Sequence, residues 1–385
     1  MFDKLIHKYG SPLYVYNANL ICTRYRELAS FFNYPHLIIH YACKANSNEF
    51  ILELLQNEGA SIETVSPGEV LLALKTGFKP DQIIHTCSNI SQTELAWLIK
   101  KRVIINLDSL NQIRWYGELK PGSGISIRVN QGIGAGHHAH VVTGGPASKF
   151  GIDIKQLDAA VSLAQEYGLS ISGIHQHIGS NVLSAPILLK SIKALLTTAR
   201  DFPKLKFIDF GGGFGVPYSA NESPLNMKAL GRLITKEMKE FTDAYGSKPL
   251  IRFEAGRYLV AESGKLLVTV TDIKKTPSKI FVGVDSGFSH LIRPAMYGSY
   301  HQIINLSRPH AKKETVTIAG NICESGDVFA VGRLLPLPKV GDVLAILNTG
   351  AYGYSMSSNY NLRPRPAELM ITGSRFRLIR EREVL

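Results

Sequence analysis

The sequence predicts an α/β fold in which a (β/α)8 barrel of the TIM type is followed by a mostly β C-terminal domain. Residues 18–254 alternate short β-branched runs with amphipathic stretches, which is typical of βα units in a parallel sheet. After Glu254 the long helical patterns stop, and β-like runs continue towards the C-terminus. With 385 residues, of which 45% are hydrophobic, the chain is long enough for one large core or two ordinary ones.

The barrel prediction depends on a count of strands and helices. The strand candidates are residues 37–41, 61–65, 82–86, 103–107, 124–129, 171–175, 207–209 and 249–254. The helix candidates that alternate with them are residues 18–32, 49–58, 67–76, 92–100, 109–117, 154–167, 185–201 and 228–245. Eight of each within about 240 residues match a (β/α)8 barrel, which typically takes about 250, better than an open sheet of five or six strands.

Beyond the barrel, the predicted elements are strands. The runs are residues 265–270, 279–284, 315–319, 343–347 and 376–379. The N-terminal segment SPLYVYN, residues 11–17, is a further strand that we expect to join them. The predicted division is therefore a barrel over residues 18–257 and a β domain made of residues 1–17 and 258–385.

Charge and composition narrow the class of protein. Subtracting 31 acidic from 43 basic residues gives a net charge of +12, but the basic residues are scattered, so we expect no nucleic acid partner. No window approaches the roughly 18 apolar residues of a membrane span, and MFDKLIHKYG has no signal-peptide core, so we expect a cytoplasmic protein without a membrane partner.

Cysteine and histidine spacing gives no metal site. The four cysteines lie far apart without CxxC spacing, which argues against a zinc site or a disulfide framework. We expect Cys22 and Cys87 to be core residues. The HHAH cluster, residues 137–140, matches no standard zinc set, so we expect no metal.

Barrel enzymes place the active site where the strands end, so the residues that follow each strand are the first candidates. The first strand runs into YACKANSN, where Lys44 directly follows an apolar run. Taken alone, Lys44 is either a lysine that extends to solvent at the barrel rim or a Schiff-base lysine whose amine a desolvated setting keeps partly neutral.

Three later strands end in polar or glycine-rich motifs. The sixth ends in HQHIGS, where alternation puts His175 and His177 on the same side. The seventh ends in DFGGGFG, residues 209–215, whose glycines let backbone amides surround an anion. The eighth ends in FEAGR, which places Glu254 and Arg257 beside that region. These barrels often bind phosphate in the loops after strands 7 and 8, so the two motifs are a candidate phosphate site.

Together these motifs specify a pyridoxal phosphate pocket. Lys44 would take the aldehyde, and glycine amides, Ser180 and Arg257 would bind the phosphate. A carboxylate buried at a strand end needs a cationic partner, which a protonated pyridine nitrogen beside Glu254 would provide, with His177 against the ring face. The competing phosphate motif GxxxxGKS/T is absent, as are the HExxH of zinc hydrolases and the GxSxG of serine esterases.

The sequence resembles a known family, the fold type III pyridoxal phosphate decarboxylases, and within it the diaminopimelate decarboxylases. Nine motifs carry the resemblance, in the family's order: YACKANSN, GAGHHAHVVTGGPASKFGI, HQHIGS, DFGGGFGVPY, FEAGRYLVAESG, VDSGF, RPAMYGSYH, CESGD and GAYGYSMSSNYNLRPRPAE. The resemblance covers nearly the whole chain. It implies an alanine racemase-like architecture with pyridoxal 5′-phosphate as cofactor.

The resemblance implies cofactor roles at matching positions. Lys44 is similar to the Schiff-base lysine, His177 to the histidine that stacks on the ring, and Glu254 to the ring-nitrogen partner. The other implied cofactor contacts are Ser180, Gly212, Gly213, Ala255, Gly256, Arg257 and Tyr352.

Other positions resemble groups that bind substrate or transfer protons. Cys323 of CESGD is similar to the proton donor to the α-carbon, which makes Lys44 and Cys323 the implied catalytic residues. Glu324 resembles a substrate-amine contact, and Arg293 and Tyr297 resemble binders of the distal carboxylate. The implied substrate contacts also include Arg257 and Tyr352.

The implied reaction is decarboxylation of meso-2,6-diaminopimelate to L-lysine and CO2, the last step of lysine biosynthesis. The family also implies a head-to-tail homodimer in which CESGD enters the partner's active site. One alternative is a decarboxylase of ornithine, lysine or arginine, whose cationic distal group calls for acidic residues, whereas Arg293 suits a carboxylate. The other is a non-catalytic cofactor-binding regulator, against which the presence of both Lys44 and Cys323 argues.

Three positions depart from the family's pattern without removing a catalytic group. Ala255 replaces the usual proline, which slightly loosens that turn. Glu63 stands where aspartate is common, and Gln131 where proline is common. Arg128, at the end of the fifth strand, is expected either to contact the cofactor region or to pair with Glu63 or Glu69.

Overall fold

The computed structural model describes residues 2–138, 140 and 142–384, so Ala139 and Val141 of the HHAHV stretch lie outside the described residues. The chain divides into two compact units. The barrel unit comprises residues 24–216 and 224–257, and the β unit comprises residues 1–23, 217–223 and 258–385. Residues 18–23, which the sequence assigned to the barrel, group with the β unit.

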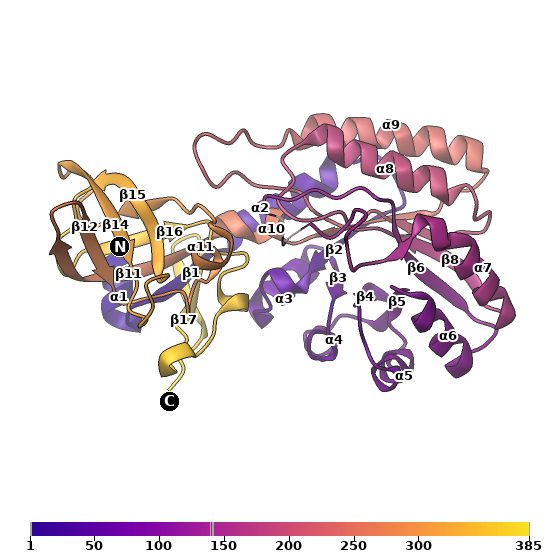
Figure 1. The fold of residues 1–385 in the computed structure, drawn as a ribbon, viewed down its shortest axis with the longest axis horizontal. Coiled ribbons are helices and arrows are strands. Elements are labelled where there is room, and N and C mark those ends of the chain that lie inside the picture. Colours follow the sequence, from indigo (N-terminus) through magenta and orange to yellow (C-terminus); the bar gives the residue numbers. More distant parts are fainter. Residues whose placement is uncertain (1, 139, 141, 385) are drawn as a thin grey trace. The chain divides into compact units, whose positions relative to one another are not determined.

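Eight parallel strands close into a barrel (Figure 1). They are β2 (Leu37–Ala42), β3 (Ser61–Thr64), β4 (Ile83–Thr86), β5 (Ile104–Leu107), β6 (Gly124–Asn130), β8 (Ser170–His175), β9 (Phe207–Asp209) and β10 (Leu250–Ala255). Each pairs with the next in this order, and β10 pairs with β2, which closes the ring. The short strand β7 (Ile152–Asp153) pairs with β6 outside the ring. The predicted (β/α)8 barrel is therefore confirmed.

Helices alternate with the barrel strands. They are α2 (Ala18–Ser30), α3 (Glu49–Asn57), α4 (Pro67–Lys75), α5 (Gln92–Lys101), α6 (Leu110–Leu119), α7 (Leu157–Glu166), α8 (Ala185–Ala199) and α9 (Met227–Tyr245). Four begin after a serine, and three of these serines, Ser66, Ser91 and Ser109, each accept a hydrogen bond from the backbone amide three residues later. These N-caps satisfy amides that lack a partner within the helix and fix where the preceding loops end.

The barrel strands bury polar side chains as well as apolar ones. Charged and histidine side chains that are buried on these strands are His40, Glu63, His85, Arg128, His175, Asp209, Arg252 and Glu254. A TIM barrel is ordinarily filled by branched apolar residues, and burying a charge costs free energy unless a partner compensates it. The polar interior therefore marks the barrel as the place to look for a site.

The β unit is built on sheet strands with few helices. Its strands are β1 (Leu13–Asn17), β11 (Gly264–Lys275), β12 (Ile280–Val284), β13 (Ile303–Asn305), β14 (Lys313–Ala319), β15 (Val328–Pro336), β16 (Val343–Leu347), β17 (Ala367–Thr372) and β18 (Arg375–Arg380). Its helices include α1 (Phe2–Tyr9) and α11 (Arg293–Tyr297), and the short α10 (Arg257–Val260) follows β10. Strand β1 lies between β11, to which it is antiparallel, and β17, to which it is parallel.

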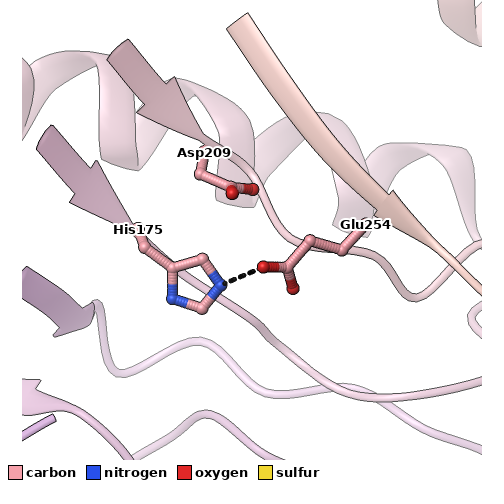
Figure 2. A group of neighbouring side chains, drawn as sticks. All are labelled: His175, Asp209 and Glu254. Carbon is pink, nitrogen blue, oxygen red and sulfur yellow. Dashed lines mark ion pairs between the residues drawn. The ribbon is translucent and has the colours of Figure 1, made fainter. Parts of the chain in front are cut away.

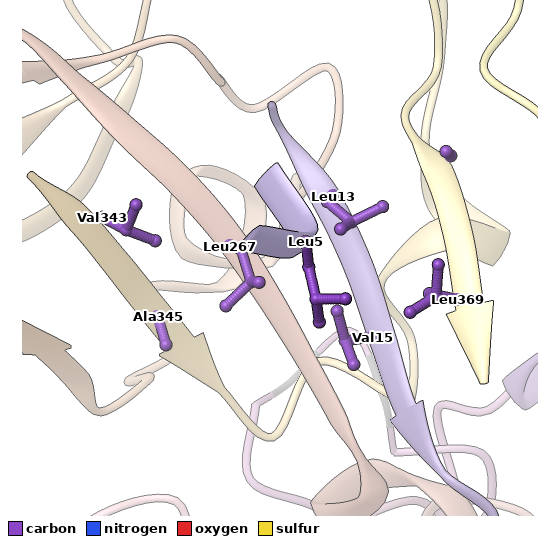
Figure 3. Close-up of a cluster of buried hydrophobic side chains, with 8 residues drawn as sticks. Leu5, Leu13, Val15, Leu267, Val343, Ala345 and Leu369 are labelled. Atoms are coloured by element: carbon purple, nitrogen blue, oxygen red, sulfur yellow. The ribbon is translucent and has the colours of Figure 1, made fainter. Parts of the chain in front are cut away.

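Helix α1 packs on this sheet. Figure 3 shows Leu5 among side chains from β1, β11, β16 and β17, all of them buried. Phe2, Ile6 and Tyr9 pack against the same cluster, so one face of the helix is apolar. The N-terminal 17 residues thus contribute both a strand and a covering helix to the β unit.

The sequence missed α1, β13, β15 and β17. Strand β15 shows why, because Val331 and Leu334 on it are two-thirds exposed and Gly332 between them has a φ of +61°. Its apolar residues therefore do not alternate with polar ones, and alternation was the signal used.

No helix within the described residues is long and apolar enough to cross a membrane. The four cysteines, all of which are described, form no disulfide.

Candidate active site

Lys44 lies directly after β2, in the 3-10 helix η1 (Cys43–Ala45). Its Nζ donates to both carboxylate oxygens of Glu63, at 2.8 and 2.7 Å. Strand β3 supplies this carboxylate, because Ala42 at the end of β2 pairs with Glu63. The Glu63 side chain is 1% exposed and the Lys44 side chain 33%. Lys44 is therefore held at the carboxyl end of the barrel by a charge-assisted pair rather than extended into solvent.

A cavity of about 330 Å³ lies at this end of the barrel unit. Its lining includes Lys44, Glu63, Arg128, His177 and Glu254. The other lining residues are Val65, Thr86, Cys87, Ser88, Thr143, Lys149, Phe150 and His175. The lysine, the histidine and the carboxylate that the sequence assigned to one cofactor thus surround one space.

Three buried side chains from the neighbouring strands β8, β9 and β10 point toward one another (Figure 2). One ligand atom from each of His175, Asp209 and Glu254 lies within 4.8 Å of the others. His175 Nε2 is 3.2 Å from Glu254 Oε1, and Asp209 accepts a hydrogen bond from the Gly211 amide at 2.9 Å. The sequence placed Glu254 here but gave no role to Asp209.

Burial dominates the electrostatics of this cluster. Burial and then the Glu63 carboxylate raise the pKa of Glu254 to about 8. Burial and then Glu254 raise the pKa of Asp209 to about 7. Burial lowers the pKa of His175 to about 4, so its imidazole is neutral at pH 7. The carboxyl groups of Glu254 and Asp209 lie beside the neutral imidazole of His175. Ionising both carboxyl groups costs free energy unless a cation lies nearby, so the cluster favours binding of a cation.

His177 presents a neutral ring of fixed orientation. Its Nδ1 accepts a hydrogen bond from the Gly212 amide at 3.1 Å, so the ring proton sits on Nε2. Burial and then the Lys44 charge hold the pKa of His177 well below its ordinary value. Such an imidazole can lie against an aromatic ring without adding positive charge to the cavity.

The loop after β9 requires its glycines. A Cβ on Gly212 would come 2.0 Å from the carbonyl oxygen of Glu254, and Gly213 has a φ of +107°. The Val182 amide donates to the Gly213 carbonyl at 2.8 Å, and the Gly215 amide donates back to the Val182 carbonyl at 3.1 Å. The two loops that the sequence assigned to phosphate binding, after β8 and after β9, are therefore joined by backbone hydrogen bonds.

Arg257 reaches the same loops from the end of β10. Its Nη2 donates to Ser180 Oγ at 3.0 Å, and the arginine is buried. Ala255 is also buried, and a Cβ on Gly256 would lie 3.0 and 3.1 Å from two alanine Cβ atoms. A guanidinium and a hydroxyl thus converge next to the glycine loop, an arrangement suited to a phosphate.

Arg128 lines the cavity, in keeping with one of its two expected roles, but its expected ion pair and the expected place of Cys87 were wrong. Arg128 forms its ion pair with Asp108, at 3.5 Å, rather than with Glu63 or Glu69. The reason is strand order, because Asp108 directly follows β5 and β5 is the neighbour of β6 in the ring. Cys87 is partly exposed and lines the cavity instead of the core.

The β unit carries the residues that the resemblance assigned to proton transfer and amine binding. Cys323 and Glu324 are both exposed on the loop between β14 and β15. The Cys323 amide donates to Asn361 Oδ1 at 3.2 Å, and the Tyr360 hydroxyl donates to Glu324 Oε1 at 2.5 Å. The thiol and the carboxylate are thus neighbours on one supported loop.

Arg293 is only 1% exposed at the start of α11. Its Nη1 is 2.9 Å from His301 Nε2, and its Nη2 donates to Ser299 Oγ at 3.3 Å. His301 Nδ1 donates to the Leu347 carbonyl at 2.8 Å, so Nε2 is the accepting nitrogen. The guanidinium lies 4.6 Å from the centre of the Tyr218 ring. These contacts orient the guanidinium without neutralising its charge.

Tyr297 and Tyr352 are half-buried in the β unit. Their contacts with cofactor or substrate stay predictions, as do those of Cys323, Glu324 and Arg293, because Lys44 lies in the other unit.

The barrel cavity has the features that pyridoxal 5′-phosphate needs. Glu254 Oε1 is buried, and although His175 Nε2 lies 3.2 Å away, the described residues donate no hydrogen bond to this oxygen, so it can pair with a protonated ring nitrogen. That nitrogen would supply the cation that the carboxyl cluster favours. Lys44 offers an amine for the aldehyde, and the glycine loop with Ser180 and Arg257 offers an anion site.

The sequence missed Asp108, Asp209 and the pairing of Lys44 with Glu63. Asp108 follows the fourth predicted strand and Asp209 ends the seventh, so the strand-end rule that selected Lys44 would also have found them. The pairing itself depends on which strands are neighbours in the closed barrel.

Residues 19–261 match the family model described as pyridoxal-dependent decarboxylase, pyridoxal binding domain. A diaminopimelate decarboxylase of Methanothermobacter thermautotrophicus is 43% identical, over 99% of this chain and 91% of that protein. The diaminopimelate decarboxylase of Escherichia coli K12 is 37% identical, over 99% of this chain and 94% of that protein.

Solved structures of decarboxylases have the same fold as this chain. Diaminopimelate decarboxylase from Helicobacter pylori, complexed with L-lysine, is 32% identical with a TM-score of 0.92, over 100% of this chain and 97% of that one. Lysine/ornithine decarboxylase from Vibrio vulnificus, complexed with putrescine, is 21% identical with a TM-score of 0.84, over 96% of this chain and 97% of that one, and shares the fold. The chain belongs to the pyridoxal phosphate-dependent decarboxylases, in the branch formed by the diaminopimelate decarboxylases.

Proposed function

We propose that this chain is a carboxy-lyase that converts meso-2,6-diaminopimelate to L-lysine and CO2 with pyridoxal 5′-phosphate. The observation that carries the proposal is that Lys44, His177 and Glu254 line one cavity beside a glycine loop that also receives Arg257. The names of relatives that are 37% and 43% identical over nearly the whole chain support the substrate.

The barrel residues hold and tune the cofactor. When bound, pyridoxal phosphate accepts into its ring the electron pair that the departing carboxylate leaves behind. Glu254 favours a positive ring nitrogen, which strengthens this electron acceptance. His177, neutral and oriented by the Gly212 amide, supports the ring face. Ser180, Arg257 and the Gly213 amide would bind the phosphate, while the Gly212 amide holds His177 and Gly212 lets the loop approach closely.

Lys44 and Glu63 act as a pair. Lys44 would hold the cofactor through its amine until a substrate amine displaced it. Glu63, which is buried and 2.7 Å from Lys44 Nζ, receives the released ammonium. The lysine therefore stays within reach of the cofactor for product release.

The β-unit residues act on the substrate. Cys323 delivers a proton to the α-carbon after CO2 leaves, and Glu324 contacts the substrate amine. Arg293 and Tyr297 bind the distal carboxylate. The active site is shared in a homodimer, in which Lys44 comes from one chain and Cys323 from the other. In support of this, Cys323 is exposed and lies in a different unit from Lys44.

We place the enzyme in the cytoplasm, acting on a small amino acid and with no nucleic acid partner. Four cysteines without a disulfide agree with a reducing compartment.

A substrate panel tests the proposed function. Release of CO2 from meso-diaminopimelate should greatly exceed release from L-lysine, L-ornithine and L-arginine. Arg293→Ala should lose most of this preference, because a buried charged contact is worth about 2 to 5 kcal/mol, or roughly 30- to several-thousand-fold. Circular dichroism and bound-cofactor absorbance would verify that Arg293→Ala folds. Arg293→Lys tests whether a positive charge without the planar guanidinium is enough for the preference. Equal rates on all four substrates would favour the decarboxylase of cationic amino acids.

A further inference from the structure

The apex of the CESGD loop is held by a segment later in the chain. Tyr360 begins the 3-10 helix η7 (Tyr360–Leu362) and donates its hydroxyl proton to Glu324 Oε1 at 2.5 Å. Asn361, the next residue, accepts a hydrogen bond from the Cys323 amide at 3.2 Å. Two consecutive residues of η7 therefore contact the two consecutive residues to which we assign amine binding and proton transfer.

The base of the same loop has its own anchor. Asp327 is buried and accepts hydrogen bonds from the Ile322 amide at 2.7 Å and the Phe288 amide at 2.6 Å. A Cβ on Gly320 would lie 2.2 Å from the Asp327 carboxylate, so the backbone there is tightly packed. The base is thus fixed in the interior, whereas the exposed apex is supported from η7.

Helix η7 and the residue after it make two further contacts near that loop. The Tyr360 ring stacks on Phe288, with centroids 5.6 Å apart and planes 20° apart. Arg363 Nη2 donates to the Asn321 carbonyl at 3.2 Å, just before the loop begins. The segment is therefore attached to Asn321 before CESGD and to Phe288, whose amide binds Asp327 at the base of the loop, as well as to the apex.

The backbone of η7 is strained. Asn361 has φ 56° and ψ 26°, and Leu362 follows with φ 52°. Asparagine tolerates the left-handed region, but leucine does so at a cost. Leu362 is 79% exposed, so burial of its side chain does not offset that cost. Strained residues of this kind concentrate at functional sites, where the surrounding contacts maintain them.

We propose that Tyr360 and Asn361 are positioning residues for the decarboxylation. Asn361 holds the backbone that carries the Cys323 thiol, and Tyr360 orients the Glu324 carboxylate that meets the substrate amine. The inference depends on the function proposed above, and it adds two residues to which the resemblance gave no role.

The two residues act on different parts of the reaction. A proton placed on the α-carbon by the Cys323 thiol yields lysine. If the thiol were misplaced, solvent would protonate the former aldehyde carbon of the cofactor instead of the α-carbon. One water would then release the substrate as an aldehyde, and its nitrogen would be left behind on the cofactor. More CO2 than lysine is then formed. A loose Glu324 would instead weaken substrate binding.

Asn361 is tested by a pair of variants. Asn361→Gly permits the same backbone conformation and removes the accepting oxygen, whereas Asn361→Asp keeps an accepting oxygen. With the holoenzyme and meso-diaminopimelate, Asn361→Gly should lower kcat about tenfold and bring the ratio of lysine to CO2 clearly below one. Asn361→Asp should keep both close to wild type.

Tyr360 is tested by removing one oxygen. Tyr360→Phe keeps the ring that stacks on Phe288 and should raise KM about tenfold, with the ratio of lysine to CO2 at one. Tyr9→Phe, which removes a hydroxyl from α1 in the same unit, is the matched control and should leave KM unchanged.

A measurement that does not use activity separates the outcomes. Loss of its acceptor should make the Cys323 amide exchange hydrogen faster in Asn361→Gly, as seen by mass spectrometry of a peptide covering residues 320–327. Unchanged exchange, or faster exchange with an unchanged product ratio and KM, would overturn the positioning role. A wild-type enzyme that releases no CO2 from meso-diaminopimelate would refute the proposed function itself, before any variant is compared.

Discussion

The barrel unit and the β unit hold their functional side chains in different ways. In the barrel, Glu63 and Glu254 are buried, and Lys44 is tied to one of them. In the β unit, Cys323 and Glu324 are exposed on a loop whose apex is held by single hydrogen bonds. The barrel is thus built in advance for a tightly held cofactor, while the β-unit loop is exposed. Substitutions in the two units should fail differently.

The largest effect is expected in the barrel, at Lys44. Lys44→Ala should lower kcat at least about a thousandfold, because it removes the amine that binds the cofactor covalently. Borohydride should fix the cofactor on Lys44 of the wild type, as located by mass spectrometry. Lys44→Arg, which keeps a positive charge beside Glu63, should carry no adduct. An adduct on another lysine would refute the assignment of Lys44.

A smaller effect is expected at Glu254, which has no covalent role. Glu254→Gln should weaken cofactor binding about 10- to 100-fold, because a hydrogen bond to a charged partner is worth about 1.5 to 3 kcal/mol. Titration of the cofactor-free protein, followed by absorbance, measures this. Unchanged affinity would mean that the carboxylate does not meet the ring nitrogen.

The same carboxyl group predicts how pH affects the cofactor-free protein. The pKa of Glu254 is about 8 in the fold and 4.5 ordinarily, and that of Asp209 is also raised. A raised carboxyl pKa gives stability that is fully present below the ordinary pKa and is lost as pH rises through the folded value. Between about pH 5 and 8, the Tm of the wild type should therefore fall more steeply than that of Glu254→Gln. If Tm fell equally with pH in the wild type and in Glu254→Gln, the raised pKa of Glu254 would be contradicted.

Mixing two mutants tests whether one active site combines the barrel unit of one chain with the β unit of the other. Lys44→Ala and Cys323→Ala should each be nearly inactive. After subunit exchange, verified by mass spectrometry, about half the dimers are mixed and each has one intact site, so about a quarter of all sites should work. If verified mixed dimers show only the summed activity of the parents, each site uses a single chain.

The smallest effect is expected from the scaffold. Ser91→Ala removes the N-cap of α5 and should lower the free energy of unfolding by about 1 kcal/mol, with kcat unchanged. Denaturant titration measures the first quantity and CO2 release the second. A large loss of activity would mean that the start of α5 affects the geometry of the cavity.

The eight barrel strands could be predicted because each is a short apolar run followed by a helix with its own periodicity. Strand β15 could not, since Val331 and Leu334 face solvent and break the alternation. Helix α1 is only eight residues long and owes its stability to packing on β1, which local sequence does not reveal.

The candidate site divides along similar lines. Lys44, Asp209 and Glu254 stand at strand ends, so each can be identified from the sequence of a single strand. The pairs Lys44–Glu63 and Arg128–Asp108 exist because β2 neighbours β3 and β5 neighbours β6, which only the closed ring specifies. Asn361 reaches Cys323 across 38 residues, and no spacing rule indicates such a contact.

The position of β1 between β11 and β17 has a consequence for synthesis on the ribosome. The strand leaves the ribosome before both partners, which begin at Gly264 and Ala367, after the whole barrel. At about 5 to 20 residues per second, the roughly 250 residues between β1 and β11 take on the order of 10 to 50 s to make. Throughout that interval β1 presents two unpaired edges, so the nascent chain is most exposed to mispairing before its last third is made.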